Sequence, residues 1–395
     1  MKHWESYLKK ERGLFTRDVY PVDFNADVIV VIPCYNEPNL FITLESLLKC
    51  SKSELNILIA IIVNSGENSD LDTILQNRKT HEEIKLFSKK TNDQGFLFTS
   101  ILCEKLPKKH AGVGLARRIG MNLAVQHFLN NENREGIIIS LDADCTVSKN
   151  YFTSICQEYN KNGKLISTVQ NMCHRVESDS IKLKNAIRQY ELYLKYYSEG
   201  LKLIGFPYYY PTIGSSFSVT ANAYVKSGGM GRQQGGEDFY FLQKIFPLGE
   251  VKYLNNTFVR PLARFSDRVP FGTGPSLQKI IEEPDSTLKV YSVQSFIELK
   301  RLIDLKDTFY KKELNEVEIL IEELHPAVRL FIHDFNFLDK INDCNNNSRT
   351  LENFRKRFFH HLNAFLIIKY MNLAHPVYFK LEPIHTVIDK SPLNL

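Results

Sequence analysis

The sequence predicts an α/β fold with a mainly parallel, doubly wound sheet, followed by a helical C-terminal region. In the first half of the 395-residue chain, short β-branched runs alternate with stretches of helical spacing, which is typical of strand–helix–strand units. These apolar runs are nearly continuous, as expected for strands covered by helices on both faces. Beyond about residue 273 the β-branched runs fade and helical spacing dominates.

The elements follow in order along the chain. Buried strands are predicted at residues 28–32, 57–63, 96–102 and 137–141. Pro33 is expected to end the first strand, and Pro38 to lie in the first turn of the next helix. Further helices are predicted at residues 114–128, 182–204, 293–309, 317–324 and 351–371, with a break at NDCNNNS. We therefore divide the chain into an α/β domain over residues 1–274 and a helical region over residues 275–395.

Composition excludes several classes of protein. With 43% hydrophobic and 24% charged residues and a net charge of +5, the chain reads as globular and gives no reason to expect a nucleic-acid partner. Its seven cysteines are scattered without a C-x-x-C pair, which indicates neither a zinc site nor a disulfide framework. The N-terminus lacks an apolar stretch of signal-peptide length, and no apolar run is long enough to cross a bilayer. We expect a soluble, cytoplasmic protein.

The segment SLDADC places two carboxylates directly after a predicted strand. Ligands collect at the carboxyl ends of strands in open α/β sheets. Two acids one residue apart are costly there unless a cation or proton neutralises them, and Mg²⁺ or Mn²⁺ has suitable ligand chemistry. Asp142 and Asp144 are therefore candidate metal ligands. Capping of a helix after Thr146 is the alternative.

Two segments could contact a nucleotide. In VIPCYNEP, Asn36 and Glu37 emerge at the end of the first strand, although this motif taken alone is better explained by an ordinary strand-to-helix turn. In AGVGLARRIGMNLA, Gly112 and Gly114 permit close backbone approach, and Arg117 lies near a helix N-terminus, which favours anions. This segment does not match the dinucleotide fingerprint, which needs a third glycine.

A glycine-rich segment, GGMGRQQGGEDF, delivers Glu237 and Asp238 to the start of a predicted helix. One acid could act as a general base near an acceptor while the helix N-terminus favours the other. Capping of the helix by both acids is the alternative.

These segments, in this order, resemble the family 2 glycosyltransferases with the GT-A nucleotide-sugar-binding fold. The resemblance rests on VIPCYNEP, the polar turn after Val63, GVGLARRIGM, DAD, GSSFSVTANAYVKSGGM and GED before a helix. It covers about residues 28–274 and makes residues 1–274 the catalytic domain. It implies a hexosyltransferase-type enzyme that moves a sugar from a UDP- or GDP-sugar to the hydroxyl of a glycan, lipid-linked or small-molecule acceptor. Mg²⁺ or Mn²⁺ would be the cofactor, and the pathway would build glycans, glycolipids, cell envelope or polysaccharide.

The resemblance also implies roles for individual residues. Asp238 would be the base that deprotonates the acceptor, supported by Glu237, and Asp144 would be the main metal ligand beside Asp142. The remaining donor-binding residues would be Pro33, Asn36, Glu37, Arg117, Gly214 and Ser215, with Ser216 beside them. Asn64 and Ser65 stand where family members commonly have two aspartates, and both can hydrogen-bond a base edge.

The departures from the family pattern narrow the function. No Q-x-x-R-W motif follows Asp238, which argues against a processive, membrane-embedded synthase. No histidine lies between His174 and His325, so the metal would rest on Asp144, the diphosphate and water. Arg264 and Arg268 could approach the phosphates or form structural ion pairs.

Other readings stay open. A nucleotidyltransferase that makes a nucleotide sugar would usually carry a glycine-rich basic loop where this chain has PCYNEP, and a degenerate, non-catalytic nucleotide-binding scaffold is the third possibility. The loop tyrosines 208–210 could form an acceptor platform. The segment ENFRKRFFHHLNAFLIIKYMN could contact the inner face of an anionic membrane or pack on the protein.

Overall fold

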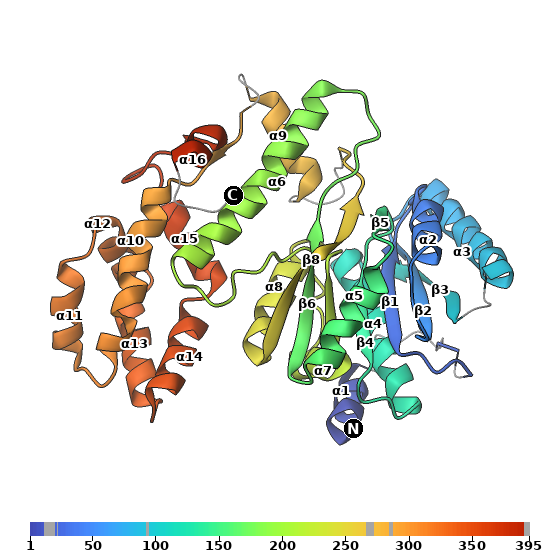
Figure 1. The fold of residues 1–395 in the computed structure, drawn as a ribbon, viewed down its shortest axis with the longest axis horizontal. Helices are drawn as coiled ribbons and strands as arrows, with labels where there is room; N and C mark the ends of the chain where they lie inside the picture. The colour runs from blue at the N-terminus through green and yellow to red at the C-terminus, as the bar shows by residue number, and fades with distance from the viewer. Residues whose placement is uncertain (12–19, 22, 92–94, 266–271, 284–286, 391–395) are drawn as a thin grey trace. The chain divides into compact units, whose positions relative to one another are not determined.

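The computed structural model describes residues 1–395 except 12–19, 22, 92–94, 266–271, 284–286 and 391–395 (Figure 1). The chain divides into two compact units. The first comprises Met1–Ser178 and Thr212–Pro275, and the second comprises Asp179–Pro211 and Ser276–Leu395. The boundary predicted at residue 274 lies beside the last change of unit, between Pro275 and Ser276, whereas the prediction did not separate residues 179–211 from the α/β domain.

Among the described residues, the first unit contains an eight-stranded sheet in the order β3-β2-β1-β4-β7-β6-β8-β5. The strands are β1 (Val28–Cys34), β2 (Ile57–Gly66), β3 (Phe96–Leu106), β4 (Ile137–Ser140), β5 (Cys145–Val147), β6 (Leu165–Met172), β7 (Phe217–Thr220) and β8 (Glu250–Pro261). The β3-β2-β1-β4 half is parallel, β7 runs antiparallel to β4 and β6, β8 is parallel to β6, and β5 is antiparallel to β8. The predicted mainly parallel α/β fold is confirmed.

The first strand continues past Pro33, contrary to the prediction that this proline ends it. Pro33 and Cys34 still pair with β2. On the other side, pairing with β4 ends at Val31 and Ser140, where the Leu141 N–H donates to the Val31 carbonyl (3.2 Å). The missing N–H of Pro33 therefore falls beyond the last rung with β4, and no ladder hydrogen bond is lost.

Helices of the first unit lie on both faces of the sheet (Figure 1). They are α1 (Lys2–Glu11), α2 (Leu40–Leu48), α3 (Leu71–Thr91), α4 (Val113–Asn130), α5 (Tyr151–Lys161), α7 (Ala221–Lys226) and α8 (Glu237–Ile245). Val30 and Ile59 belong to a core cluster shared with α2, α3 and α5, whereas Val31 and Ile62 face Gly120 of α4. Covering both faces explains why these strands read as continuous apolar runs.

The second unit is mainly helical. Its elements are α6 (Ile181–Leu203), α9 (Thr273–Glu282, which begins in the first unit), α10 (Val293–Asp304), α11 (Leu314–Glu322), α12 (Pro326–Asp334), α13 (Phe337–Asn346), α14 (Leu351–His361), α15 (Ala364–Ala374) and α16 (Ile384–Lys390), with the short strands β9 (Lys289–Val290) and β10 (Glu382–Pro383). In its core, Phe296 packs beside Tyr196, with ring centroids 5.9 Å apart.

The predicted C-terminal helices differ from the structure in two details. The asparagine-rich segment is helical as far as Asn346, where α13 ends, so the predicted break falls only at the last two residues of that segment. The single helix predicted at 351–371 is two helices, because the Asn363 side chain accepts a hydrogen bond from the Leu366 N–H (2.9 Å) and starts α15 anew. Asparagine is one of the residues preferred at the N-cap of a helix, because its side chain can accept such a hydrogen bond. The long helix α3 was not among the predicted helices.

Close packing of α4 on the sheet depends on Gly120. A Cβ atom on this residue would lie 2.4 Å from Val31 Cγ1 and 2.9 Å from Ile62 Cγ1. We expect Gly120→Ala to lower the free energy of unfolding by about 1–3 kcal/mol, because helix and sheet must move apart. Urea unfolding curves would measure the change. Gly163→Ala is the control, since a Cβ atom there meets nothing within 4 Å. Equal stability of the two variants would contradict the expectation.

Candidate active site

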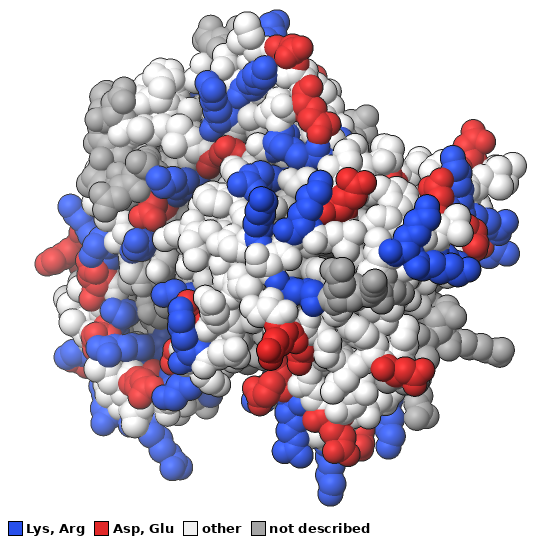
Figure 2. All heavy atoms as spheres, turned by 45° about the vertical axis from the view of Figure 1, so that its right-hand side comes forward, with Lys and Arg blue, Asp and Glu red and all other residues white. Residues whose placement is uncertain are grey.

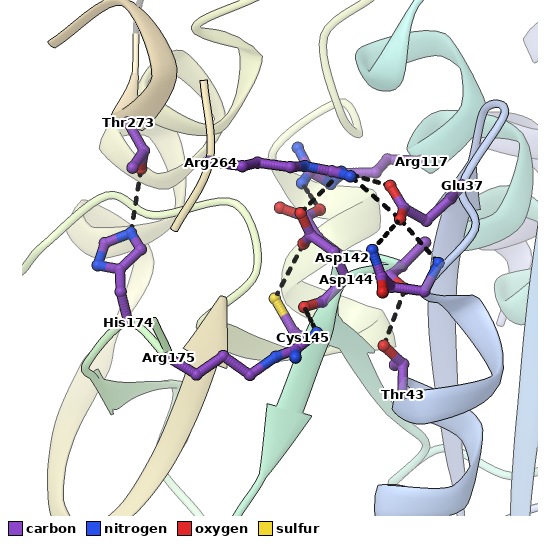
Figure 3. Close-up of polar contacts among 12 residues, drawn as sticks. Glu37, Thr43, Arg117, Asp142, Asp144, Cys145, His174, Arg175, Arg264 and Thr273 are labelled. Carbon is purple, nitrogen blue, oxygen red and sulfur yellow. Dashed lines mark hydrogen bonds and ion pairs between the residues drawn. The ribbon is translucent and has the colours of Figure 1, made fainter. Parts of the chain in front are cut away.

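The Asp142–Asp144 turn connects β4 directly to β5. The turn is fixed from two sides, because the Cys145 N–H donates to the Asp142 carbonyl (3.2 Å) and Thr43 Oγ1 of α2 donates to the Ala143 carbonyl (2.8 Å). Helix α5 begins only at Tyr151, with Asn150 as its N-cap. The two aspartates therefore do not cap a helix, and their carboxylates are left for other partners (Figure 3).

Topology brings Glu37 to the same edge of the sheet. Because β1 and β4 are parallel neighbours, the segments that follow them leave the sheet side by side. Arg264, just after β8, joins the two segments (Figure 3): its Nη2 contacts Asp144 Oδ2 at 3.0 Å, and its guanidinium makes a two-point contact with the Glu37 carboxylate. Glu37 also accepts hydrogen bonds from the backbone and side chain of Asn39. The predicted structural ion pairs of Arg264 are confirmed.

A second arginine joins the aspartate turn to α8. Arg117 of α4 is 3% exposed and forms ion pairs with both Asp142 and Glu237. Gly214 covers this guanidinium so closely that a Cβ atom there would lie 2.6 Å from it. The burial of Arg117 leaves little of its surface open to a donor, so its predicted contact with phosphates stays a prediction.

The acids of this cluster outnumber the guanidiniums that contact them. Glu37, Asp142, Asp144, Glu237 and Asp238 carry five carboxylates, which the side chains of Arg117 and Arg264 partly neutralise. Burial raises the pKa of Asp144 to about 6, and the charge of Asp142 adds to the effect. Burial also raises the pKa of Glu237 to about 7, against the opposing charge of Arg117. The cluster therefore has an excess of negative charge that favours a bound cation.

Asp238 lies at the start of α8, beside Glu237. Gly236, with φ of 71°, precedes the helix, and the Asp238 carboxylate accepts a hydrogen bond from the N–H of Phe239 (2.8 Å). Burial raises the pKa of Asp238, although the charge of Arg117 lowers it in part. Glu237 points to Arg117 rather than capping the helix, so the capping alternative fails for that residue.

The two glycines of the GVG segment make room for the protein's own backbone. A Cβ atom on Gly114 would lie 2.3 Å from the Gln233 carbonyl oxygen, and one on Gly112 would lie 3.1 Å from Gln234 Cα. Both contacts belong to the loop that leads to Glu237. The close approach expected from the sequence therefore exists, and its partner is the acid-bearing loop.

Two of the predicted nucleoside-contacting residues are held together by hydrogen bonds to a third residue, which the sequence analysis did not single out. Asn77 of α3 is fully buried. Its Oδ1 accepts from the Asn36 N–H (2.9 Å) and its Nδ2 donates to the Asn64 carbonyl (2.9 Å). Asn77 thus connects the turn after β1 to the carboxyl end of β2, where buried Ser65 follows Asn64. The residues around Asn77 in the sequence are equally polar, so nothing local marks it. It could have been noticed only if α3 had been predicted as a helix.

The remaining predicted residues lie in three places. Gly214 precedes β7, and because β7 is antiparallel to β4, the Gly214 carbonyl accepts from Ser140 Oγ (2.6 Å); Ser215 and Ser216 are buried beside it. His174 contacts Thr273 Oγ1 (3.1 Å; Figure 3). Tyrosines 208–210 belong to the second unit, and Arg268 lies outside the described residues.

Within the described part of the chain, no three His, Cys, Asp or Glu side chains gather closely enough to hold a metal ion. Asp142 and Asp144 nevertheless fit Mg²⁺ or Mn²⁺, because such ions are commonly bound by one or two carboxylates together with substrate phosphates and water. Burial and then the charge of Asp142 raise the pKa of Asp144 despite its ion pair with Arg264, and a bound cation would offset both effects. The residues present therefore suit a metal that arrives with a phosphorylated substrate.

Burial of Arg117 between two acids predicts a large effect on stability. We expect Arg117→Met to lower the free energy of unfolding by about 3–5 kcal/mol, because it leaves the buried Glu237 carboxylate without its cation. Adding Glu237→Gln should restore part of the loss, with a coupling of about 0.5–3 kcal/mol.

Chemical unfolding of the single and double variants would measure both quantities. Arg78→Met is the control, because the Arg78–Glu104 pair is exposed and should matter little. Strictly additive effects of Arg117→Met and Glu237→Gln would contradict the assignment.

Comparison with known proteins identifies the family of one part of the chain. No curated protein sequence matches the chain. Among solved structures, S. aureus TarS 1–349 in complex with UDP-GlcNAc matches at 10% identity and a TM-score of 0.41, covering 85% of this chain and 91% of that one. S. aureus TarS matches at 12% identity and a TM-score of 0.38, covering 86% and 50%. The family model for glycosyl transferase family 2 matches residues 29–214. These residues are a family 2 glycosyltransferase domain with the GT-A fold.

Proposed function

We propose that this glycosyltransferase moves a hexose from a UDP- or GDP-sugar to an acceptor hydroxyl by a single displacement that inverts the anomeric carbon. One observation carries the proposal: Arg117 and Arg264 join acids from the ends of β1 and β4 and from the start of α8 into one cluster. The cluster brings together the candidate donor-binding residue Glu37, the candidate metal ligands Asp142 and Asp144, and Glu237, which is the neighbour of the candidate base Asp238.

The donor side of the proposal uses the carboxyl ends of β1 and β2 and the turn after β1. The residues that would surround the nucleoside are Pro33, Asn36, Glu37, Asn64 and Ser65. Asn77 would act as a positioning residue, since it fixes the backbone of Asn36 and Asn64. Amide and hydroxyl groups can hydrogen-bond the edge of a base, so the absence of an aspartate pair in the second turn does not prevent binding.

Asp142 and Asp144 would hold Mg²⁺ or Mn²⁺, which when bound neutralises charge on the leaving diphosphate. Arg264 contacts both Glu37 and Asp144, the acids assigned to the nucleoside and the metal, and it would add positive charge beside the diphosphate. Gly214 and Ser215 would lie beside the transferred sugar.

Asp238 would accept the proton of the acceptor hydroxyl as that oxygen attacks the anomeric carbon. The bond from this carbon to the diphosphate breaks in the same step, and its electron pair leaves with the diphosphate. A carboxylate is a better base when its pKa is raised toward neutrality, and burial raises the pKa of Asp238. Glu237 would support Asp238 by pairing with Arg117, whose positive charge otherwise lowers the pKa of Asp238.

The acceptor is less defined. The basic residues of α14 are paired with acids: Arg355 with Asp307, Lys356 with Glu352, and Arg357 and His361 with Asp343. On the face shown in Figure 2, basic and acidic side chains are interspersed over most of the surface. These pairs favour packing of α14 on the protein over binding to an anionic membrane, and a lipid-linked acceptor at the inner membrane face stays a prediction.

The described chain contains no helix with the length and apolar character needed to span a membrane.

Asp238→Asn tests the base. Because asparagine cannot accept the proton, we expect kcat to fall by about 10²–10⁴-fold, while binding of UDP or GDP with Mn²⁺ stays unchanged. Release of free nucleotide from a panel of UDP- and GDP-sugars, with and without candidate acceptors, would measure turnover. Asp304→Asn, in an exposed pair with Lys300 of α10, is the matched control. Near-normal transfer by Asp238→Asn would rule out the base assignment.

Asp144→Ala tests the metal site. The wild-type protein should bind UDP or GDP more tightly with Mn²⁺ than with EDTA, because Asp142 and Asp144 would hold an ion that neutralises the charge of the diphosphate. The variant should bind equally weakly in both conditions. Titration calorimetry would measure the two dissociation constants. A wild-type affinity that does not depend on metal would overturn the proposal of a metal site.

A further inference from the structure

We infer that Glu11 and Arg118 are positioning residues that fix the loop of residues 228–236 and thereby place Asp238. The inference rests on the proposed function, in which Asp238 is the base. Glu11 is the last residue of α1, and Arg118 follows Arg117 in α4. Both side chains lie outside the acid cluster and have no role in the proposed chemistry.

Arg118 binds the beginning of the loop. Its two terminal nitrogens donate to the carbonyl oxygens of Met230 and of Gly228, the latter at 3.2 Å. Gly228 and Gly229 both have positive φ, 80° and 78°, so this part of the loop has little intrinsic preference for its conformation. The guanidinium, itself 8% exposed, supplies the fixed points that the loop sequence lacks.

Glu11 orients Arg118. Its Oε2 accepts from Arg118 Nε (2.7 Å) and from Asn122 Nδ2 (3.3 Å) and lies 3.8 Å from a terminal nitrogen of Arg232, which belongs to the loop. Burial raises the pKa of Glu11, but the hydrogen bond and charge of Arg118 outweigh this and bring it below the usual value. Glu11 is therefore an ion that touches both the helix and the loop.

The rest of this contact region confirms that α1 is part of the loop's support. Helix α1 lies beside α4 and α7 (Figure 1). Tyr7 and Tyr224 both donate to Asn122 Oδ1 (2.8 Å each), and a Cβ atom on Gly229 would lie 2.0 Å from the Tyr7 hydroxyl. The loop thus packs directly against the N-terminal helix.

The end of the loop is fixed by the residue next to Arg118. Arg117 pairs with Glu237, and Gln234 Nε2 donates to the Lys108 carbonyl (2.7 Å) just before α4. Consecutive residues of a helix point about 100° apart, so one dipeptide can face the loop start with Arg118 and the acid cluster with Arg117. If the start of the loop moved, the displacement would be transmitted to Asp238 through residues 231–237 of the chain.

Burial of the Arg118–Glu11 pair gives little stability by itself. Desolvation of two charges offsets much of their attraction, so apolar side chains of similar volume often stabilise a fold equally well. The pair does, however, fix the position of the loop backbone, since the planar guanidinium of Arg118 can bond Glu11 and the loop carbonyls together only in one geometry. This specificity is what a loop carrying a catalytic base requires.

The test compares Glu11→Gln and Arg118→Lys in the wild-type and Asp238→Asn backgrounds. We expect kcat for nucleotide release from the UDP- or GDP-sugar that the wild type uses to fall about 10–100-fold, as for a small misplacement of a reacting group. The dissociation constant of UDP or GDP with Mn²⁺ should not change. In the Asp238→Asn background the same substitutions should cause no further loss, because the group that they misplace is already missing.

Glu104→Gln is the matched control, since it removes the same charge from the exposed Arg78–Glu104 pair and should leave kcat unchanged. An unchanged kcat in Glu11→Gln and Arg118→Lys, or an equal loss in both backgrounds, would overturn the inference. Full activity of Asp238→Asn would instead refute the proposed base, so the two failures are distinguishable.

Hydrogen–deuterium exchange gives a readout that does not depend on turnover. We expect Arg118→Lys to raise backbone exchange in residues 228–238 while the Asp142–Asp144 turn keeps its wild-type rate. Tyr7→Phe, which removes one hydroxyl only, provides a milder variant if Arg118→Lys does not fold, and it should show the same pattern more weakly. Unchanged exchange in the loop of the folded variants would overturn the inference.

Discussion

The candidate site depends on one constraint: a buried guanidinium, Arg117, has acids on both sides. Ions of this kind are tolerated in an interior only when their charges and hydrogen-bonding groups are matched. Asp142 and Glu237 supply this match from the end of β4 and the start of α8. The packing of these two segments around α4 follows from the requirement, and Gly112, Gly114 and Gly214 leave the space that it needs.

The sheet supplies the second part of the arrangement. Parallel pairing of β1 with β4 brings Glu37 and the Asp142–Asp144 turn to one edge, and antiparallel β7 returns Gly214 to that edge. Arg264 then balances part of the charge from a fourth segment. A ligand with its own positive ion and phosphates can replace such internal pairs, because it offers the carboxylates equivalent partners.

Adjacent arginines divide two tasks between them. Arg117 faces the acids, whereas Arg118 faces the backbone of the loop that leads to them. The N-terminal helix joins this arrangement through Glu11 and Tyr7. Helix α1, which lies outside the residues matched by the family 2 model, thus contributes to the geometry of the site. The acids of the site themselves come from the matched residues and from α8.

Sequence by itself determined the α/β class, the parallel strands β1 to β4 and the segments bearing Glu37, Asp142, Asp144, Glu237 and Asp238, because apolar strand runs and strand-end acids are local signals. It could not determine which arginine pairs with which acid, since three of the four pairs join residues more than one hundred positions apart. Asn77 and Glu11 were invisible for the same reason: each is one polar residue among many until the fold buries it. Only tertiary structure decided that residues 179–211 join the helical unit, because α6 packs its apolar face on helices far along the chain.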